Sequence, residues 1–590
     1  MPSGARAATA KRQWYPTAWR FALLAFLLLA FALRVYRLGA QSLWYDEGVT
    51  AQVASQGLAE LTRWTAGDIQ PPLYYYLVAG WVRLVGRSEW ALRFPSAFFG
   101  VLTVALTWAL ARRLFAVQGH KEEEFRGDTP QAPRPHGAPL LAALLAAISP
   151  LYVYYAQEAR MYTLLTFLGA LAGYLLLRIL GEMRPARRRR LWAAFALTSI
   201  AALYTHYFAV FLLTAFALYF LLIITHHATR NTQYAIRNTS HVPCLTFYSS
   251  LLEALMAFLT IILAYLPWLP AMLTRFREDA SYWHGTLKLD EALRHVLISF
   301  SMGETVLEAI AVKLMWGFVV ILGLSVSALA GRKVVGSKVA GHKVARGENV
   351  IRGRFSLLFL LLYLFVPLAL ILLLSYRNPK FNPRYLMLAH PAFLLLMAGG
   401  IAALWSWAEE RRQAAGRISH LLPLASCFLL LVSLLFILAT QAYAVHNWFT
   451  DPAFTKADFR GVARYVREHI APDETVILTS GHLSPVWDYY APDIERHRLP
   501  DIDILDVNAT LGYHTANDLN RILAGKRGVW TVLWQDEVVD PNGFLRDFLA
   551  RAGEEQPVER RFWHVGLRHY RLPEGVRFSS CLLYTSDAAD

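Results

Sequence analysis

Two adjacent carboxylates follow the first long apolar segment of the chain. Asp46 and Glu47 lie in the stretch SLWYDEGVT, among aromatic side chains. Neighbouring residues on a helix or strand point in different directions, so we do not expect this pair to share one proton. We expect one carboxylate to face a cavity and the other to accept hydrogen bonds or bind a cation. The alternatives are a solvated loop pair, or an N-cap and acidic first turn of a helix through EGVTAQVAS.

A second group with chemical potential ends the third apolar segment. The stretch SPLYVYYAQEARMY places Glu158 and Arg160 two positions apart beneath a run of tyrosines. These two side chains could pair with each other as an ordinary ion pair under an aromatic belt at the membrane interface. That interpretation explains the tyrosines. It does not explain why the chain re-enters an apolar segment directly after the tetrapeptide QEAR.

Two further stretches carry candidate residues. The sequence LYTHYF places His206 in a very short connection between two apolar segments, where a lone histidine is more often a capping or packing residue. The sequence YRNPKFNPRYLMLAHP contains three cations, Arg377, Lys380 and Arg384. Clustered cations beside a membrane favour an anionic partner such as a lipid phosphate.

The composition of the chain indicates the kind of protein that must position these residues. It has 590 residues, of which 56% are hydrophobic and 17% are charged, whereas soluble domains are about 25% charged. An apolar run of about 20 residues can cross a bilayer as a helix. We therefore predict a polytopic α-helical membrane protein with about eleven transmembrane helices, near residues 17–36, 94–114, 138–155, 161–181, 191–206, 207–226, 248–270, 306–330, 355–375, 385–405 and 421–441.

The charges of the loops predict the orientation of these spans. With a cytoplasmic N-terminus, the most basic connections, including EMRPARRRR and AEERRQAAGR, fall on the cytoplasmic side, as the positive-inside rule requires. Residues 73–86 are then an interfacial or re-entrant helix, because a full span there would place RPARRRR outside. This topology accounts for most of the net charge of +15, so the charge does not indicate a nucleic-acid partner. All the candidate residues above lie on the outer face.

The chain is predicted to contain two domains and a tail. Residues 1–441 form the transmembrane domain, and residues 442–577 form a small extracytoplasmic α/β domain. Within the second domain, TKADFRGVARYVREHI and NGFLRDFLARAG predict helices, while ETVILTS and GVWTVLW predict strands. The three cysteines are not placed to pair on the outer side, so no disulfide framework is expected. Residues 578–590 continue no pattern of the domain and are predicted to be a non-native or disordered tail.

The residue types on the outer face suit the transfer of a group from a phosphate ester in the membrane. A departing phosphate needs cationic stabilisation, an attacking hydroxyl needs a general base, and a lipid tail needs an apolar groove. The order of the motifs is also informative, because the Asp-Glu pair is followed by QPPLYYYLVAGW, EWALRFPSAFFG and YYAQEARMY. In this order they resemble the GT-C superfamily of polyprenyl-phosphate-sugar-dependent glycosyltransferases, in particular its protein O-mannosyltransferase-like and aminoarabinose transferase-like family.

The resemblance covers roughly residues 17–405 and implies a role for each candidate. Asp46 matches the carboxylate that acts as base on the acceptor hydroxyl, with Glu47 as its supporting neighbour. Glu158 matches an acidic residue that helps to bind the acceptor or a divalent cation. The resemblance also implies interfacial helices in residues 50–90 and a single displacement that inverts the anomeric carbon. The remaining candidates are Arg160, Arg384 and Tyr385 for the lipid phosphate, and His206 for the sugar or a cation.

The sequence thus predicts a glycosyltransferase of a prokaryotic plasma membrane, with a polyprenyl-phosphate sugar as donor and a protein, lipid or glycan as acceptor. Membrane lipid is a partner, nucleic acid is not, and no spacing of residues compels a metal site. The alternative is a polytopic transporter or flippase of lipid-linked sugars. Transporters usually place ionisable groups near the bilayer midplane and often contain internal repeats, and the sequence shows neither. A non-catalytic scaffold would leave the charged clusters without a role.

Overall fold

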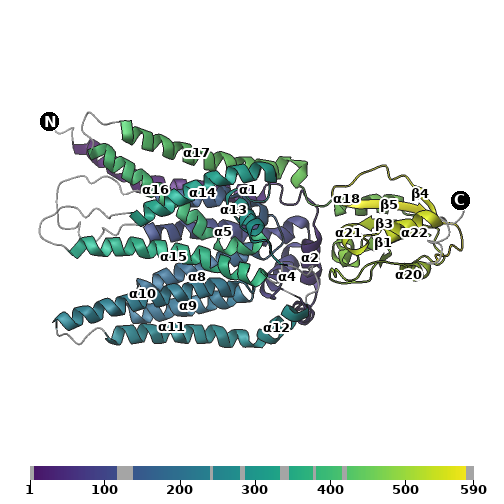
Figure 1. Ribbon diagram of the computed structural model, residues 1–590, viewed down its shortest axis with the longest axis horizontal. Coiled ribbons are helices and arrows are strands. Elements are labelled where there is room, and N and C mark those ends of the chain that lie inside the picture. The colour runs from purple at the N-terminus through teal and green to yellow at the C-terminus, as the bar shows by residue number, and fades with distance from the viewer. Residues whose placement is uncertain are drawn as a thin grey trace.

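The computed structural model is an elongated molecule in which a bundle of long helices carries a small sheet domain at one end (Figure 1). The N-terminal end of α1 lies at the opposite end of the bundle from the sheet domain. The predicted cytoplasmic loops at 116–136 and 332–343 lie outside the described residues. The structure describes residues 5–68, 70–115, 137–238, 244–278, 286–331, 344–376, 381–414 and 421–579.

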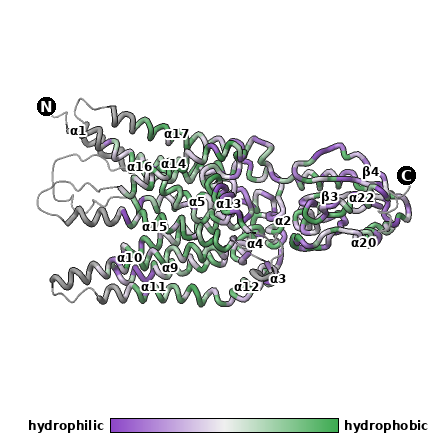
Figure 2. The backbone as a smooth tube through the Cα atoms, viewed as in Figure 1, coloured by the Kyte–Doolittle hydropathy of each residue, from purple (hydrophilic) through white to green (hydrophobic). Residues whose placement is uncertain are grey.

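Nine helical segments in the described part of the chain are long and apolar enough to cross a membrane. A tenth is a pair bent by 49°, α6 (Gly137–Ile148) and α7 (Pro150–Ala156). Figure 2 shows that these helices are mainly hydrophobic. The nine are α1 (Ala5–Val35), α5 (Glu89–Phe115), α8 (Tyr162–Leu180), α10 (Ala209–Asn238), α11 (Cys244–Tyr265) with η2 (Leu266–Trp268) and α12 (Leu269–Glu278), α14 (Glu308–Gly331), α15 (Val344–Ser375), η3 (Pro383–Ala389) with α16 (His390–Ala414), and α17 (Leu421–Thr450).

About eleven spans were predicted, and the described residues contain nine segments of this kind, or ten with the bent pair. The predicted span 191–206 overlaps α9 (Pro185–Leu203), which packs between α8 and α11. As a whole, α9 is not apolar enough to be counted among the membrane-spanning segments. The reason is visible in its sequence, because its first two turns contain four consecutive arginines. The other ten predicted spans correspond to the nine segments and the bent pair.

Short helices gather at the end of the bundle that faces the sheet domain (Figure 1). Three of them come from the first loop: α2 (Tyr45–Ser55), α3 (Leu58–Ala66) and α4 (Leu73–Val85). α4 is an apolar helix of 13 residues, too short to cross a bilayer, as predicted for residues 73–86. A fourth short helix, α13 (Leu289–Met302), precedes α14. Among the candidate residues, Asp46 and Glu47 lie on one of these helices, α2.

The sheet domain contains five strands in the order β2-β1-β3-β5-β4. β1 is parallel to β2 and β3, whereas β5 is antiparallel to β3 and β4. The two predicted strands and two predicted helices are confirmed as β1, β3, α18 and α22. The elements are η4 (Pro452–Phe454), α18 (Phe459–His469), β1 (Glu474–Thr479), η5 (Gly481–Leu483), α19 (Ser484–Tyr490), β2 (Arg496–Arg498), α20 (Thr515–Ile522), β3 (Gly528–Leu533), α21 (Asp536–Val539), α22 (Phe544–Ala552), β4 (Glu554–Gln556) and β5 (Gly566–Arg571).

The two faces of the sheet have different cores. One face packs with α20 and α22 into a separate hydrophobic cluster, which includes Leu519, Val529 and Leu549. Phe578 belongs to this cluster and its backbone bonds to Asn520. The packed part of the domain therefore extends one residue into the segment expected to be a tail, whereas residues 580–590 lie outside the described ranges.

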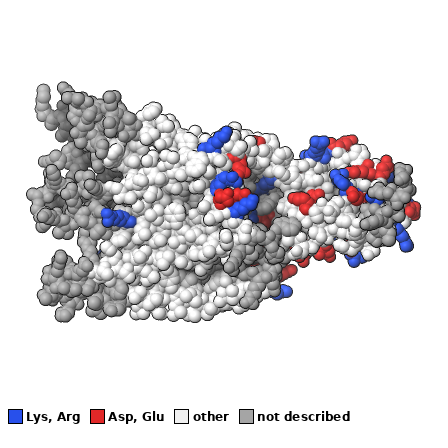
Figure 3. Space-filling view, viewed as in Figure 1, with Lys and Arg blue, Asp and Glu red and all other residues white. Residues whose placement is uncertain are grey.

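The other face of the sheet is continuous with the core of the membrane bundle. Residues of β1, α18 and α19 share one buried hydrophobic cluster with α2 and the bundle helices. α2 and α19 approach so closely that a Cβ atom at Gly48 would lie 2.7 Å from the Val486 Cα. Arg460 of α18 also bonds to Glu89 at 2.7 Å. The sheet domain is therefore docked on the first-loop helices rather than tethered loosely. Figure 3 shows charged side chains mainly around α13, near the sheet-domain end of the bundle, and over the sheet domain, while the rest of the visible bundle surface is mostly uncharged.

Candidate active site

Asp46 and Glu47 lie in the first turn of α2, and their side chains reach different surroundings, as expected for neighbours on a helix. The Asp46 side chain is 16% exposed. Its Oδ2 lies 3.5 Å from Arg160 Nη2 and 3.3 Å from Arg384 Nη1. We call these three residues the Asp46 cluster. Because its segments are distant in the sequence, with Asp46 and Arg384 separated by 338 positions, only the fold brings them together.

Glu47 is completely buried and is held by two cations. Arg93 donates to both carboxylate oxygens at 2.7 and 2.8 Å, and Lys456 Nζ lies 3.1 Å from Oε2. The backbone N–H of Ala159 donates to Oε1 at 2.9 Å. Burial alone would raise the pKa of Glu47, but the charges of Arg93 and Lys456 and these hydrogen bonds lower it below its usual range. We call Glu47, Arg93 and Lys456 the Glu47 cluster.

Arg93 connects the first loop to α5. Its guanidinium is buried and donates, besides its two bonds to Glu47, to the carbonyl oxygens of Leu38, Gln41 and Ser42, each at 2.9 Å. These carbonyls belong to the turn that leads from α1 into α2. The Glu47 cluster therefore fixes the entry to α2, and with it the position of Asp46.

Glu158 and Arg160 do not pair through their side chains. They lie in the turn between α7 and α8, where the Arg160 N–H donates to the Glu158 carbonyl oxygen at 2.8 Å. The Arg160 guanidinium turns to Asp46, whereas Glu158 Oε1 lies 3.5 Å from Lys456 Nζ. Glu158 is 2% exposed, and burial raises its pKa. The tight turn explains why the alternative of an ordinary ion pair is not formed, because it sends the two side chains toward different clusters.

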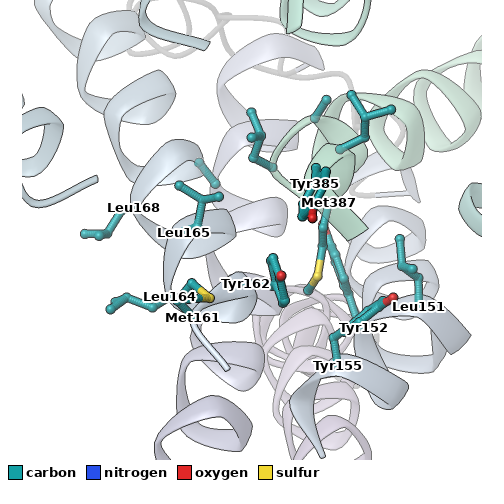
Figure 4. Close-up of a cluster of buried hydrophobic side chains, with 14 of the residues drawn as sticks. Leu151, Tyr152, Tyr155, Met161, Tyr162, Leu164, Leu165, Leu168, Tyr385 and Met387 are labelled. Atoms are coloured by element: carbon teal, nitrogen blue, oxygen red, sulfur yellow. The ribbon is translucent and has the colours of Figure 1, made fainter. Parts of the chain in front are cut away.

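An aromatic shell surrounds the Asp46 cluster. The Arg384 guanidinium lies over the rings of Trp44, Tyr162 and Tyr385, at 5.8, 5.5 and 5.7 Å from their centroids. Tyr162 of α8 and Tyr385 of η3 lie together in one buried cluster (Figure 4), with ring centroids 6.4 Å apart. His206 packs beside both of these tyrosines. The structure thus brings Arg160, Arg384, Tyr385 and His206 around Asp46.

The two ring nitrogens of His206 differ, because Nδ1 has a local hydrogen bond and the buried Nε2 has no partner among the described residues. Its Nδ1 accepts a hydrogen bond from the Phe208 N–H at 3.2 Å, which is the capping arrangement considered from the sequence. Burial and the nearby charges of Arg160 and Arg384 lower its pKa to about 3, so the ring is neutral. Since Nδ1 accepts, the proton of the neutral ring is on Nε2, which is then a donor.

Several polar atoms of this site have no hydrogen-bond partner among the residues that the structure describes. They are Arg160 Nε, Arg384 Nε, Tyr162 Oη and His206 Nε2, and all are buried. Most buried polar groups in proteins are hydrogen-bonded, and an unsatisfied one costs about 1–3 kcal/mol. The Asp46 cluster therefore has spare donors for a ligand. The other two cations predicted near it, Arg377 and Lys380, lie outside the described residues.

The donor set around Asp46 does not fit a divalent cation. Two guanidinium groups contact its carboxylate, and Glu47 is occupied by Arg93 and Lys456. Across the described ranges, no group of three or more His, Cys, Asp or Glu residues is placed to hold a metal ion. We therefore derive no step through a metal.

Sequence reasoning did not select Arg93, Lys456 or Tyr162. A signal was present for two of them, because Arg93 lies in EWALRFPSAFFG and Tyr162 ends YYAQEARMY, both motifs of the family resemblance. A charged residue within an apolar helix is also informative by itself. Lys456 had no such signal, because it precedes a surface-like amphipathic helix and resembles an ordinary solvated lysine.

Comparisons with known proteins identify the fold that carries this site. A family model described as dolichyl-phosphate-mannose-protein mannosyltransferase matches residues 69–119, which contain α4 and α5 with Arg93. ArnT from Cupriavidus metallidurans in the apo state has a similar structure, with a TM-score of 0.53 and 13% identity over 94% of this chain and 98% of that chain. The chain has the GT-C fold. It is an integral membrane protein, and the predicted fold class is confirmed.

Two further GT-C structures are similar. ArnT from Cupriavidus metallidurans bound to undecaprenyl phosphate has a TM-score of 0.51 and 14% identity, with the same coverage of 94% and 98%. The archaeal oligosaccharyltransferase AglB from Archaeoglobus fulgidus, in complex with an inhibitory peptide and a dolichol-phosphate, has a TM-score of 0.50 and 11% identity over 94% of this chain and 75% of that chain. Identities this low establish the shared fold only. No curated protein sequence matches the chain.

Proposed function

We propose that this GT-C chain is a glycosyltransferase that moves a sugar from a polyprenyl-phosphate-linked donor to a hydroxyl or similar group of an acceptor. The match of α4 and α5 to a mannosyltransferase family model supports this proposal. The similar structures with undecaprenyl phosphate and dolichol-phosphate also support it, because both ligands are lipid phosphates. The geometry of the Asp46 cluster gives the most specific support.

One observation carries the proposal. The Asp46 cluster holds two guanidinium groups for one carboxylate, and the Nε atoms of both have no partner among the described residues. A buried cluster with one excess positive charge and unused donors is complementary to an anion. A lipid phosphate would supply that charge and accept from these donors, since charge-assisted hydrogen bonds to phosphate are among the strongest in proteins. The aromatic rings around Arg384 would contact the adjacent isoprenoid or sugar carbons.

In the proposed reaction Asp46 is the general base. The acceptor oxygen attacks the anomeric carbon while the bond from that carbon to the phosphate oxygen breaks. The acceptor proton passes to an Asp46 oxygen, and the electron pair of the broken bond leaves with the lipid phosphate. Arg160 and Arg384 stabilise the negative charge that develops on the departing phosphate, and the anomeric configuration is inverted. His206 Nε2–H and the Tyr162 hydroxyl are placed to donate to the phosphate or the sugar.

Glu47 has a positioning role in this proposal. Its carboxylate is saturated by Arg93, Lys456 and the Ala159 N–H, so it has no free oxygen for a substrate. Its bond to Ala159 fixes the residue next to Arg160. Glu47 therefore aligns the turn that presents Arg160 with the helix that presents Asp46.

We further propose that the N-terminus is cytoplasmic and that the sheet domain lies outside, in a prokaryotic plasma membrane. The basic loops support this orientation through the positive-inside rule. The α1 N-terminus and the sheet domain lie at opposite ends of the bundle, and α2, which carries Asp46, lies at the sheet-domain end (Figure 1). Donor and acceptor would then meet at the outer leaflet.

Binding of undecaprenyl phosphate tests whether the Asp46 cluster holds a lipid phosphate. The purified protein in nanodiscs should be stabilised against heat by this lipid, and Arg384→Ala should weaken the interaction about tenfold or more, because a charge-assisted hydrogen bond is lost. Arg83→Ala serves as control, since Arg83 is an exposed cation at the same end of the bundle. Equal lipid binding by Arg384→Ala and wild type would contradict the phosphate site. Comparison of glycans and lipids from cells with and without the gene would then identify sugar and acceptor.

A further inference from the structure

A cavity of about 450 Å³ lies where the sheet domain meets the bundle. Small-molecule sites in proteins commonly have volumes of about 300–1,000 Å³. The bundle side of the wall comes from the entry to α2 and from the α7–α8 turn. Most of the remaining wall comes from the end of β3, from α21 and from the start of β5. The lining residues are Trp44, Tyr154, Glu158, Lys456, Ala457, Leu533, Trp534, Gln535, Asp536, Glu537, His564 and Gly566.

The charges of this lining differ from those of the Asp46 cluster. Three carboxyl groups line the cavity, from Glu158, Asp536 and Glu537, against the single ammonium of Lys456. That ammonium is 5% exposed and lies between Glu47 and Glu158, at 3.1 and 3.5 Å. Its charge is therefore already matched by two carboxylates. A phosphate or another anion in this cavity would meet a net negative environment.

The lining of the cavity includes aromatic residues and two residues with a buried polar atom that has no partner among the described residues. Trp44, Tyr154 and Trp534 contribute large rings to the lining. Glu158 is 2% exposed, and its Oε2 has no hydrogen-bond partner in the described part of the chain, nor has Trp44 Nε1. A buried carboxylate with one oxygen unsatisfied is costly unless a ligand donates to it. Flat rings beside oxygen acceptors and an N–H donor are complementary to the apolar faces and hydroxyl groups of a sugar ring.

Trp44 connects this cavity to the Asp46 cluster. It lines the cavity and its ring lies 5.8 Å from the Arg384 guanidinium carbon. It also immediately precedes α2, in which Asp46 is the second residue. A molecule bound against Trp44 would therefore lie next to the proposed base. The sheet domain, which supplies Trp534, Asp536 and Glu537, then has a direct part in binding.

We propose that this cavity binds a neutral or cationic sugar residue of the acceptor, an inference that rests on the proposed glycosyltransferase function. Its carboxylates accept hydrogen bonds from sugar hydroxyl or ammonium groups, and its rings contact the carbon faces of the sugar. The two sites are thus opposite in charge. The Asp46 cluster takes the anionic lipid phosphate of the donor, and the acidic cavity excludes phosphate and takes a glycan.

Saturation-transfer difference NMR of the full chain in nanodiscs tests this assignment with three probes of similar size and different charge: glucosamine, glucose and glucose 6-phosphate. Glucosamine and glucose should give signals, and glucose 6-phosphate should give the weakest. Trp534→Ala should weaken sugar binding about threefold to tenfold, the worth of one aromatic contact. Glu537→Gln, at an exposed position, should narrow the preference for glucosamine over glucose 6-phosphate. Glu559→Gln removes an exposed carboxylate outside the cavity and should change neither result.

The assignment is overturned if glucose 6-phosphate binds as well as glucosamine, if none of the sugars binds, or if both cavity variants match wild type. Binding of a neutral Ser/Thr-rich peptide with no binding of the sugars would also overturn it. Undecaprenyl phosphate binding, measured on the same samples, separates the two proposals. Lipid binding without sugar binding contradicts only the cavity assignment. Sugar binding without lipid binding contradicts the proposed function and the cavity's role as acceptor site.

Discussion

The Asp46 and Glu47 clusters begin at adjacent residues and have opposite properties. Glu47 is fully buried, and both of its oxygens are partnered by Arg93, Lys456 or the Ala159 N–H. Asp46 is partly exposed, and its two arginines retain donors without partners among the described residues. The Glu47 cluster therefore has no carboxylate oxygen free for a ligand, whereas the Asp46 cluster has an excess positive charge and N–H donors that a ligand can use. The comparison teaches that one Asp-Glu motif can provide a buried structural anchor and, beside it, a carboxylate in a cluster with donors left for a ligand.

The largest expected effect on stability is that of Arg93→Met. This change leaves Glu47 buried with Lys456 as its only cation, and breaking a buried ion pair by removing one partner costs about 3–5 kcal/mol. The free energy of unfolding, measured by denaturant titration in detergent, should fall by that amount.

Arg384→Met is the matched control for this change. It makes the same substitution in the Asp46 cluster, where Arg160 still pairs with Asp46. We expect a loss of at most about 1 kcal/mol, because the variant relieves an excess of positive charge. Equal losses for the two variants would remove the distinction between an anchor and a binding cluster.

A smaller effect is expected for Lys456→Met. This lysine is the cation nearest to Glu158 and the second cation of Glu47, so its loss should cost about 1–3 kcal/mol. Adding Glu158→Gln should restore part of that stability, because the carboxylate left without a partner is then removed. A double-mutant cycle measures the coupling, which should be about 1 kcal/mol. If the stability changes of Lys456→Met and Glu158→Gln are strictly additive, Lys456 does not couple Glu158 to Glu47.

The smallest effect concerns pH, and it has opposite signs for the two buried glutamates. The pKa of Glu47 is lowered in the fold, so its contribution to stability is present above about pH 4.3 and is lost as the pH falls. The pKa of Glu158 is raised by burial, so its contribution is present below about pH 4.3 and is lost as the pH rises through its folded pKa.

Thermal unfolding of single variants across this pH range separates the two. In Glu47→Gln the free energy of unfolding should decrease less as the pH falls, and in Glu158→Gln it should decrease less as the pH rises. Each difference from wild type should be on the order of 1 kcal/mol. The Glu559→Gln profile should follow wild type. Profiles for the two glutamate variants that change with the same sign would contradict the distinction between them.

The sequence carried enough information for the fold class and for the divergence of Asp46 and Glu47. Long apolar runs indicate spans, and neighbours on a helix must point apart. The predicted span 191–206 corresponds to α9, whose apolar residues 191–203 pack in the bundle although four arginines precede them. Arg384 was selected from the cations of its own stretch, whereas its contact with Asp46 at 3.3 Å is seen only in the fold.

Lys456 shows what could not be predicted. It lies 409 positions from Glu47, in a segment that resembles the solvated start of an amphipathic helix. Its burial depends on the docking of the sheet domain against α2, which is a property of the assembled fold. The acidic cavity has the same origin, since Glu158 and Glu537 come from separate domains. Local patterns predict elements well, but the charges that meet between two domains depend on how the domains pack.

The central claim is that Asp46 is the general base for the acceptor hydroxyl, while Glu47 only holds Asp46 in position. Asp46→Asn in nanodiscs with a polyprenyl-phosphate sugar and the acceptor identified from cells measures this directly. The variant should lose about 10²–10⁴-fold in kcat, the worth of a general base, while its thermal unfolding and undecaprenyl phosphate binding remain close to wild type. Near-normal turnover by Asp46→Asn would contradict the account.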